Sequence, residues 1–131
     1  MGTALTILVD THALHWWLDD PVRLSPVASG AFQDPESSLI ISCVVPWEFA
    51  IKVRAGKLNV QSVLEQWEEM LEVQGFFELP IESAHAIRAG LLPLHHRDPF
   101  DRMLAAQAQV TGWPIISADR IFDYYGVRRI W

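Results

Sequence analysis

The chain has 131 residues, a formal net charge of −6 and a half-hydrophobic composition. This length is typical of one domain, residues 1–131, with its own core, and the composition excludes a disordered chain. The negative charge argues against general electrostatic binding of nucleic acid, unless several acids gather around metal ions.

Further features of the composition predict a cytoplasmic protein without membrane contact. The most apolar run, residues 39–51, is interrupted by Pro46 and Glu48 and is too short to cross a bilayer. No basic residue precedes Arg23, so the chain lacks the charged start of a secretory signal. The single Cys43 cannot form an internal disulfide, which suits a reducing compartment.

The first expected elements are a buried strand over residues 5–9 and a helix that begins at Thr11. Asp10 lies at the carboxyl end of that strand, where open α/β sheets bind their ligands. We expect Thr11 to cap the helix and to orient Asp10, although Asp10 is also a good helix cap by itself. A short helix from residue 25 and a strand over residues 38–43 follow.

The middle of the chain predicts a helix over residues 46–56, with Glu48 in its first turn and Gly56 as a left-handed terminator. Lys52 follows Glu48 by four residues, which predicts an ion pair of about 0.3–0.5 kcal/mol. This pair is compatible with a metal-binding role for Glu48. Next come an amphipathic helix over residues 60–73, whose acids form a solvated face, a strand over 76–79 and a helix over 83–91.

The stretch from His96 to Ala108 predicts a helix with two acids in its first turn. Asp98 is the expected N-cap, Pro99 fits the first helical position, and Asp101 follows three residues after the cap. Capping alone would explain both acids. A chemical role for Asp98 and Asp101 is suggested only by the positions of the other acids in the chain.

The C-terminal part repeats the arrangement seen at Asp10. A strand over residues 114–117 ends at Ser117, and Asp119 follows it directly. A short helix over 120–125 and a closing strand within 127–131 complete the chain. The alternation of short apolar strands with helices predicts an α/β fold, a three-layer α/β/α arrangement around a central mostly parallel sheet.

In such a sheet the carboxyl ends of the strands share one edge, so five acids of the chain are expected to meet there. They are Asp10, Glu48, Asp98, Asp101 and Asp119. Each pair of carboxylates about 6 Å apart would cost about 3 kcal/mol at an effective dielectric constant of ~20. A cation would offset this repulsion, and an all-oxygen site suits Mg²⁺ or Mn²⁺. Such a site could activate water for phosphodiester hydrolysis.

The histidines have no spacing typical of a zinc site. His95 and His96 are expected to have a loop or substrate-facing role, whereas we expect His12, His15 and His85 to be packing or surface residues.

Four segments in order resemble the PIN-domain ribonucleases, specifically the VapC-type toxins of bacterial toxin–antitoxin pairs. These segments are LVDTHALHWWL, VPWEFAIKVRAGKL, LPLHHRDPFDRMLAAQA and PIISADRIFDYYG. The resemblance implies a PIN-like fold, Mg²⁺ or Mn²⁺, an RNA substrate, a homodimer and a cognate antitoxin protein. It also implies a catalytic and metal-binding quartet of Asp10, Glu48, Asp101 and Asp119.

The resemblance further implies accessory roles for Thr11, Asp98 and Ser117, and Arg102, next to Asp101, could contact a phosphate. Val45 departs from the pattern, because relatives often have a small polar residue there.

Two other classes of function remain open at this point. A non-catalytic α/β binding module would keep the scaffold without turnover. An aspartate-based phosphatase would need a second Asp two residues after Asp10, where this chain has His12. Such a phosphatase, like a receiver domain, would also need a lysine late in the chain, whereas Lys52 and Lys57 are its only lysines.

Overall fold

A central parallel sheet organises the molecule. The computed structural model describes residues 4–95 and 98–131, and within them five strands pair in the order β3-β2-β1-β4-β5, every pair parallel. The strands are β1 (Thr6–Val9), β2 (Ser38–Ser42), β3 (Phe77–Leu79), β4 (Ile115–Ile116) and β5 (Arg129–Ile130). In the register, Leu8 of β1 faces Ile40 of β2 on one side and Ile115 of β4 on the other.

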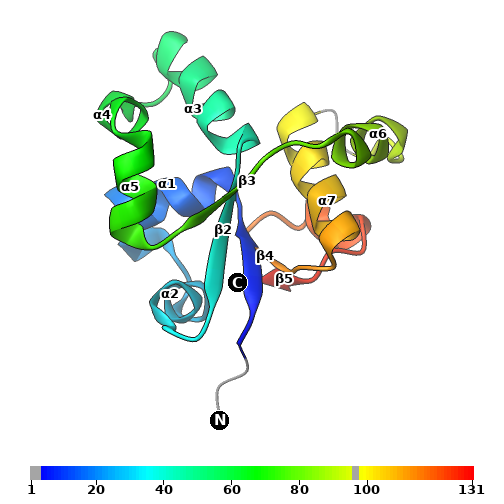
Figure 1. The fold of residues 1–131 in the computed structure, drawn as a ribbon, viewed down its shortest axis with the longest axis horizontal. Helices are drawn as coiled ribbons and strands as arrows, with labels where there is room; N and C mark the ends of the chain where they lie inside the picture. Colours follow the sequence, from blue (N-terminus) through cyan, green and yellow to red (C-terminus); the bar gives the residue numbers. More distant parts are fainter. Residues whose placement is uncertain (1–3, 96–97) are drawn as a thin grey trace.

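Helices cover both faces of this sheet, as Figure 1 shows: α6 and α7 lie on one side, and α1, α2 and α5 on the other. The helices are α1 (Thr11–Asp19), α2 (Pro26–Gln33), α3 (Val44–Arg54), α4 (Gln61–Glu65), α5 (Trp67–Gln74), α6 (Ser83–Leu91), α7 (Pro99–Thr111) and α8 (Ile121–Tyr124), with a short 3₁₀ turn at Pro21–Arg23. The predicted three-layer α/β/α class is confirmed.

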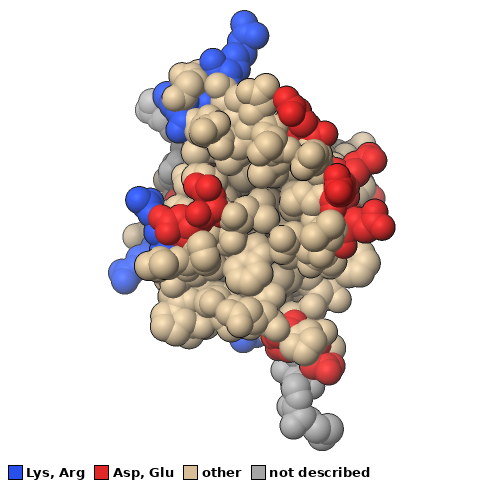
Figure 2. Space-filling view, turned by 90° about the vertical axis from the view of Figure 1, so that its left-hand side faces the viewer, with Lys and Arg blue, Asp and Glu red and all other residues tan. Residues whose placement is uncertain are grey.

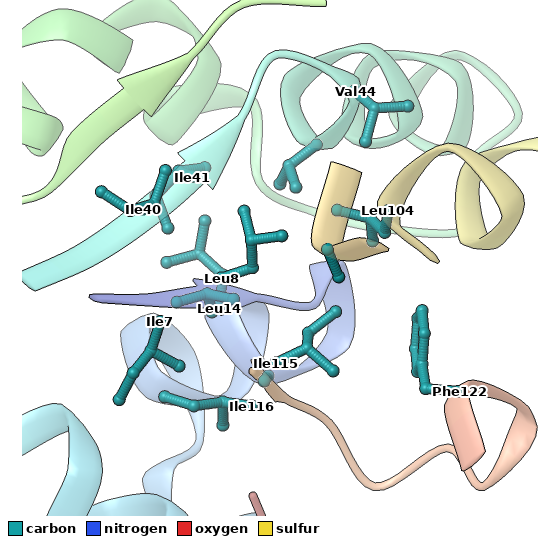
Figure 3. Close-up of a cluster of buried hydrophobic side chains, with 14 of the residues drawn as sticks. Ile7, Leu8, Leu14, Ile40, Ile41, Val44, Leu104, Ile115, Ile116 and Phe122 are labelled. Carbon is teal, nitrogen blue, oxygen red and sulfur yellow. The ribbon is translucent and has the colours of Figure 1, made fainter. Parts of the chain in front are cut away.

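The core lies where the sheet meets the helices on either side. Ile7, Leu8 and Ile115 from the two central strands are almost fully buried, together with Leu14 of α1 and Leu104 of α7. Figure 3 shows these side chains converging from strands and helices. The continuous apolar runs of the central strands reflect this burial on both faces, as is usual for parallel sheets.

The strand order reverses direction beside β1. The chain runs from β1 to β2 and β3 on one side, then returns to place β4 and β5 on the other. In open α/β sheets, ligands bind at the carboxyl ends of the strands at such a switch point. Here that point lies between the ends of β1 and β4, immediately before Asp10 and Ser117.

Several predicted strands are shorter at their ends than expected, and two predicted helices differ in where they begin or in their continuity. Helix α3 begins at Val44, two residues before Pro46, because the Ser42 hydroxyl accepts a hydrogen bond from the Val44 amide at 3.1 Å. We had expected Glu48 in the first turn of this helix, but the earlier start places it beyond that turn. The helix predicted over residues 60–73 is divided at Gln66, whose backbone leaves helical geometry (φ −116°, ψ 34°).

In the described part of the chain, no helix has both the length and the apolar character needed to span a membrane.

Candidate active site

Asp10 is a buried carboxylate at the junction of β1 and α1. The hydroxyl of Ser117, which follows β4, donates to Asp10 Oδ2 at 2.7 Å, whereas Oδ1 is buried with no hydrogen-bond partner among the described residues. Burial raises the pKa of Asp10 to about 6, with a smaller contribution from Glu48, against the lowering effects of Ser117 and His12. This carboxylate therefore has an unused buried oxygen.

Glu48 is the second buried acid, and α3 holds it. Lys52, one turn later, places its Nζ 2.9 Å from Glu48 Oε2, with side-chain exposures of 28% for the lysine and 5% for the glutamate. The ion pair predicted from the i,i+4 spacing is confirmed. It supplies one positive charge to a carboxylate that would otherwise be buried alone.

The start of α7 holds the next two acids. Asp98 is the N-cap, and its Oδ1 accepts hydrogen bonds from the amides of Phe100 at 2.8 Å and Asp101 at 3.3 Å. Asp101 is half-buried, and its pKa rises to about 8, first through burial and then through the charges of Asp10, Asp98, Asp119 and Glu48. Asp101 thus experiences the field of every other acid in the expected set.

Asp119 is the exposed member of this set. Its amide donates to Ser117 Oγ at 3.0 Å, and its Oδ1 accepts from the amide of Ile121 at the start of α8. Ser117 therefore bonds to both Asp10 and Asp119, because its hydroxyl donates to one and accepts from the other.

The acids gather at one edge without closing into a coordination shell. Within residues 4–95 and 98–131, no set of three or more His, Cys, Asp or Glu side chains forms a group that could hold a metal ion. Like charges that lack a cation are expected to splay or protonate in this way. The donor chemistry nevertheless fits a hard divalent cation, since all ligands offered are carboxylate oxygens and Asp10 Oδ1 is buried without a described partner.

Comparison with known proteins identifies the family. The sequence matches the PIN domain family over residues 7–127. The chain belongs to the PIN domain family. This agrees with the family resemblance predicted from the sequence, and the VapC-type part of that resemblance is supported by one curated relative.

That relative is Ribonuclease VapC22 of Mycobacterium tuberculosis (strain ATCC 25618 / H37Rv), 28% identical over 116 residues and 88% of each chain. Two solved structures share the fold. VapBC-1 from nontypeable Haemophilus influenzae has a TM-score of 0.64 at 16% identity, over 95% of this chain and 96% of the other. FitAcB from Neisseria gonorrhoeae has a TM-score of 0.61 at 20% identity, over 94% and 95%.

Two residues for which the sequence predicted accessory roles have surroundings that it did not predict. Thr11 is the first residue of α1 and not its cap, a position that Asp10 occupies, and its buried hydroxyl has no partner among the described residues. Arg102 Nη2 donates to the backbone carbonyls of Ala89 at 2.8 Å and Leu92 at 3.3 Å. A phosphate contact by Arg102 stays a prediction, and it would require its other nitrogens.

The histidines of the PIN domain differ in their settings. His85 is buried, and its Nδ1 accepts from the Glu82 amide at 3.1 Å, as a packing residue would. His95 is exposed and packs against the ring of Tyr125, whereas His96 lies outside the described residues. His12 is exposed, as expected of a surface residue, and with Asp10 it lines a hollow that the sequence did not predict.

The distribution of charged side chains on the surface agrees with the net charge of −6. Figure 2 shows the side of the molecule on which α4 and α5 lie, with Asp and Glu in separate groups and Lys and Arg toward the margin. Among the described residues of this face, no continuous basic surface is present for a nucleic acid.

Proposed function

We propose that this PIN domain is a divalent-metal-dependent endoribonuclease and acts as the toxin of a toxin–antitoxin pair. The observation that carries the proposal is the gathering of acids from four segments of the chain around Asp101, whose burial together with their charges raises its pKa to about 8. These acids lie at the topological switch point of a parallel sheet, where such folds bind their ligands. The name of the relative VapC22 supports RNA as the substrate.

Four residues would hold the cation: Asp10, Glu48, Asp101 and Asp119. Mg²⁺ or Mn²⁺ bound there would activate a water molecule and stabilise the charge that develops on a phosphodiester. The chain's own groups prepare this site. Ser117 orients Asp10 by its hydrogen bond at 2.7 Å, and Lys52 holds Glu48 in place by an ion pair at 2.9 Å. Asp98, by capping α7, fixes the turn that carries Asp101.

In this scheme Asp101 has to lose a proton when the metal ion binds. With a pKa of about 8, its carboxyl retains a proton at neutral pH while no cation is bound. It has to release that proton before both oxygens can act as ligands. We therefore expect metal binding to release protons and to tighten as the pH rises.

The experiment is RNA cleavage with purified protein in Mg²⁺, in Mn²⁺ and in EDTA. We expect cleavage only with a divalent ion, and a loss of about 100-fold or more in Asp10→Asn and Asp101→Asn, because removing one partner of such a site removes most of the transition-state stabilisation. Glu72→Gln, on the exposed face of α5, is the matched control.

Cleavage that persists in EDTA, or in folded Asp101→Asn, would overturn the metal-dependent mechanism. RNA binding without any cleavage would instead favour the non-catalytic module. Each variant needs a thermal unfolding curve, so that loss of activity is separated from loss of fold.

The partners follow from the same proposal. We infer a cognate antitoxin, supported by the solved toxin–antitoxin complex from Klebsiella pneumoniae that shares this fold. From the family resemblance we also infer a homodimer and a cytoplasmic location. Co-expression with the short DNA-binding protein expected from a neighbouring gene should give a stable complex and suppress cleavage. Sedimentation of the protein alone would test the homodimer.

A further inference from the structure

A hollow of about 230 Å³ opens beside the proposed catalytic carboxylates. Asp10, His12, Trp16, Ala118 and Asp119 line it, so its walls come from the start of α1 and the loop after β4. Pockets that enclose a drug-sized molecule usually measure about 300–1,000 Å³, and this hollow is smaller. Its size suits one ring system held against an open surface.

The aromatic wall consists of two side chains one helical turn apart. His12 and Trp16 have ring centroids 5.9 Å apart and ring planes tilted by 38°. Trp16 is half-buried and its ring lies 5.8 Å from that of Trp131, whereas His12 is exposed. The Arg23 guanidinium lies 5.8 Å from the Trp16 ring centroid. His12 is thus the ring that faces an incoming group.

The other wall determines what can enter. Asp10 and Asp119 place carboxylates at the hollow, and these repel a phosphate that arrives without a cation. A neutral heterocycle meets no such repulsion. Its faces can stack on the aromatic rings, and its N–H groups meet carboxylate acceptors. Aromatic stacking is a general way in which proteins hold bases of single-stranded RNA.

We propose that this hollow binds one nucleobase of single-stranded RNA, stacked on His12 and Trp16, next to the phosphodiester that a cation bound by the carboxylates would hold. The proposal rests on the proposed ribonuclease function and adds a specificity residue, His12, to it. The position of the base relative to the carboxylates would then decide which bond of the RNA is cut.

The test uses short single-stranded RNAs that carry one abasic nucleotide at successive positions. Binding is measured by fluorescence anisotropy in Mg²⁺ with Asp101→Asn protein, which is expected to leave the RNA intact. We expect one abasic position to weaken binding by about 5- to 100-fold, the range found when stacking on a single base is lost. Equal binding by every RNA of the series, or no measurable binding by any, would overturn the proposal.

Three substitutions at one position distinguish stacking from other roles of the side chain. In the Asp101→Asn background, His12→Ala and His12→Gln should weaken RNA binding as much as the critical abasic nucleotide does. RNA binding by these variants should then no longer depend on whether that nucleotide carries its base. His12→Phe keeps a ring and should retain binding. His15→Ala, one turn along α1 and outside the hollow, is the matched control; its ring contacts Phe49 and pairs with Asp19 at 3.6 Å. Unchanged binding by His12→Ala would overturn the proposal.

The two proposals can fail separately. If wild-type protein cuts RNA but no abasic position or His12 variant changes binding, the nucleobase site is refuted and the ribonuclease function stands. If the wild type never cuts RNA but the abasic and His12 effects are present, the base-binding site stands and the catalytic proposal is refuted. Mapping the cleaved RNA ends adds a check, because wild type and His12→Phe should cut the same phosphodiester bond.

Discussion

The hydroxyl of Ser117 donates to Asp10 Oδ2 at 2.7 Å, joining two buried residues that are 107 positions apart in the sequence. The contact crosses from the end of β4 to the end of β1, the point at which the strand order reverses. Ser117 also accepts from the amide of Asp119 at 3.0 Å. One hydroxyl therefore sets the position of two of the proposed ligands.

Replacing Ser117 by alanine should destabilise the protein and reduce cleavage. Asp10 Oδ2 would lose its hydrogen bond while still buried, which is expected to cost about 1–3 kcal/mol in free energy of unfolding. Urea unfolding at pH 7.5 measures this cost. Ser29→Ala, which removes a surface hydroxyl that accepts from Gln33, should stay within about 0.5 kcal/mol. Equal costs for the two variants would refute the role given to Ser117.

Without divalent ions, the stability of the protein should fall as the pH rises from about 4 to 8. The pKa of Asp101 is about 8 in the folded protein, against an ordinary value of 3.8, so the folded state binds the proton more tightly across this range. Stability contributed by a raised pKa is complete below the unfolded value and is lost as the pH approaches the folded value. Asp10 acts with the same sign up to about pH 6.

Thermal unfolding in EDTA at a series of pH values measures this effect. Asp101→Asn should flatten the dependence and unfold at least about 3 °C above wild type at pH 8, because a neutral amide replaces a crowded carboxylate. Glu72→Gln should follow the wild-type curve. Wild-type stability that increases from pH 5 to 8 would contradict the assignment.

Replacing Lys52, whose ammonium group lies beside Glu48, should lower the free energy of unfolding. A divalent ion should restore part of that loss. In Lys52→Met, Glu48 remains 5% exposed at the side chain but loses the ammonium group 2.9 Å away. Breaking a buried pair costs about 3–5 kcal/mol; because Lys52 is partly exposed, we expect about 2 kcal/mol. Mg²⁺ should stabilise this variant more than it stabilises wild type.

Lys57→Met is the control for that experiment, since Lys57 is exposed and is the chain's other lysine. It should change the free energy of unfolding by less than about 0.5 kcal/mol. If both lysine variants respond equally to Mg²⁺, the ion does not act at Glu48.

Patterns local in the sequence predicted the sheet and the edge where the acids lie. The apolar runs before Asp10 and Asp119 defined the strands, and the four-residue spacing of Glu48 and Lys52 predicted their ion pair. These features depend on neighbours in the chain, so periodicity and capping rules were sufficient.

Features that depend on distant contacts were not predictable in this way. The division at Gln66 precedes Trp67, whose indole donates to Glu78 of β3 at 2.7 Å. The early start of α3 is different, because it follows a local hydrogen bond from the Val44 amide to the Ser42 hydroxyl, whereas the prediction began the helix at Pro46. The sequence placed Asp10 and Ser117 at the same edge but not their hydrogen bond. His12 was assigned to packing or surface because nothing local showed that a hollow would open next to it.

Arg102 gives the last prediction, since its bonds differ from the phosphate contact that the sequence suggested. Its Nη2 donates to the carbonyls of Ala89 and Leu92, which joins α7 to the end of α6. Arg102→Ala should therefore lower the free energy of unfolding by about 1–3 kcal/mol, whereas KM for RNA should rise only if its other nitrogens contact a phosphate. Arg88→Ala removes a surface bond to Gln109 between the same helices and should cost less than about 0.5 kcal/mol. A large rise in KM for Arg102→Ala with unchanged stability would instead assign this side chain to the substrate phosphate.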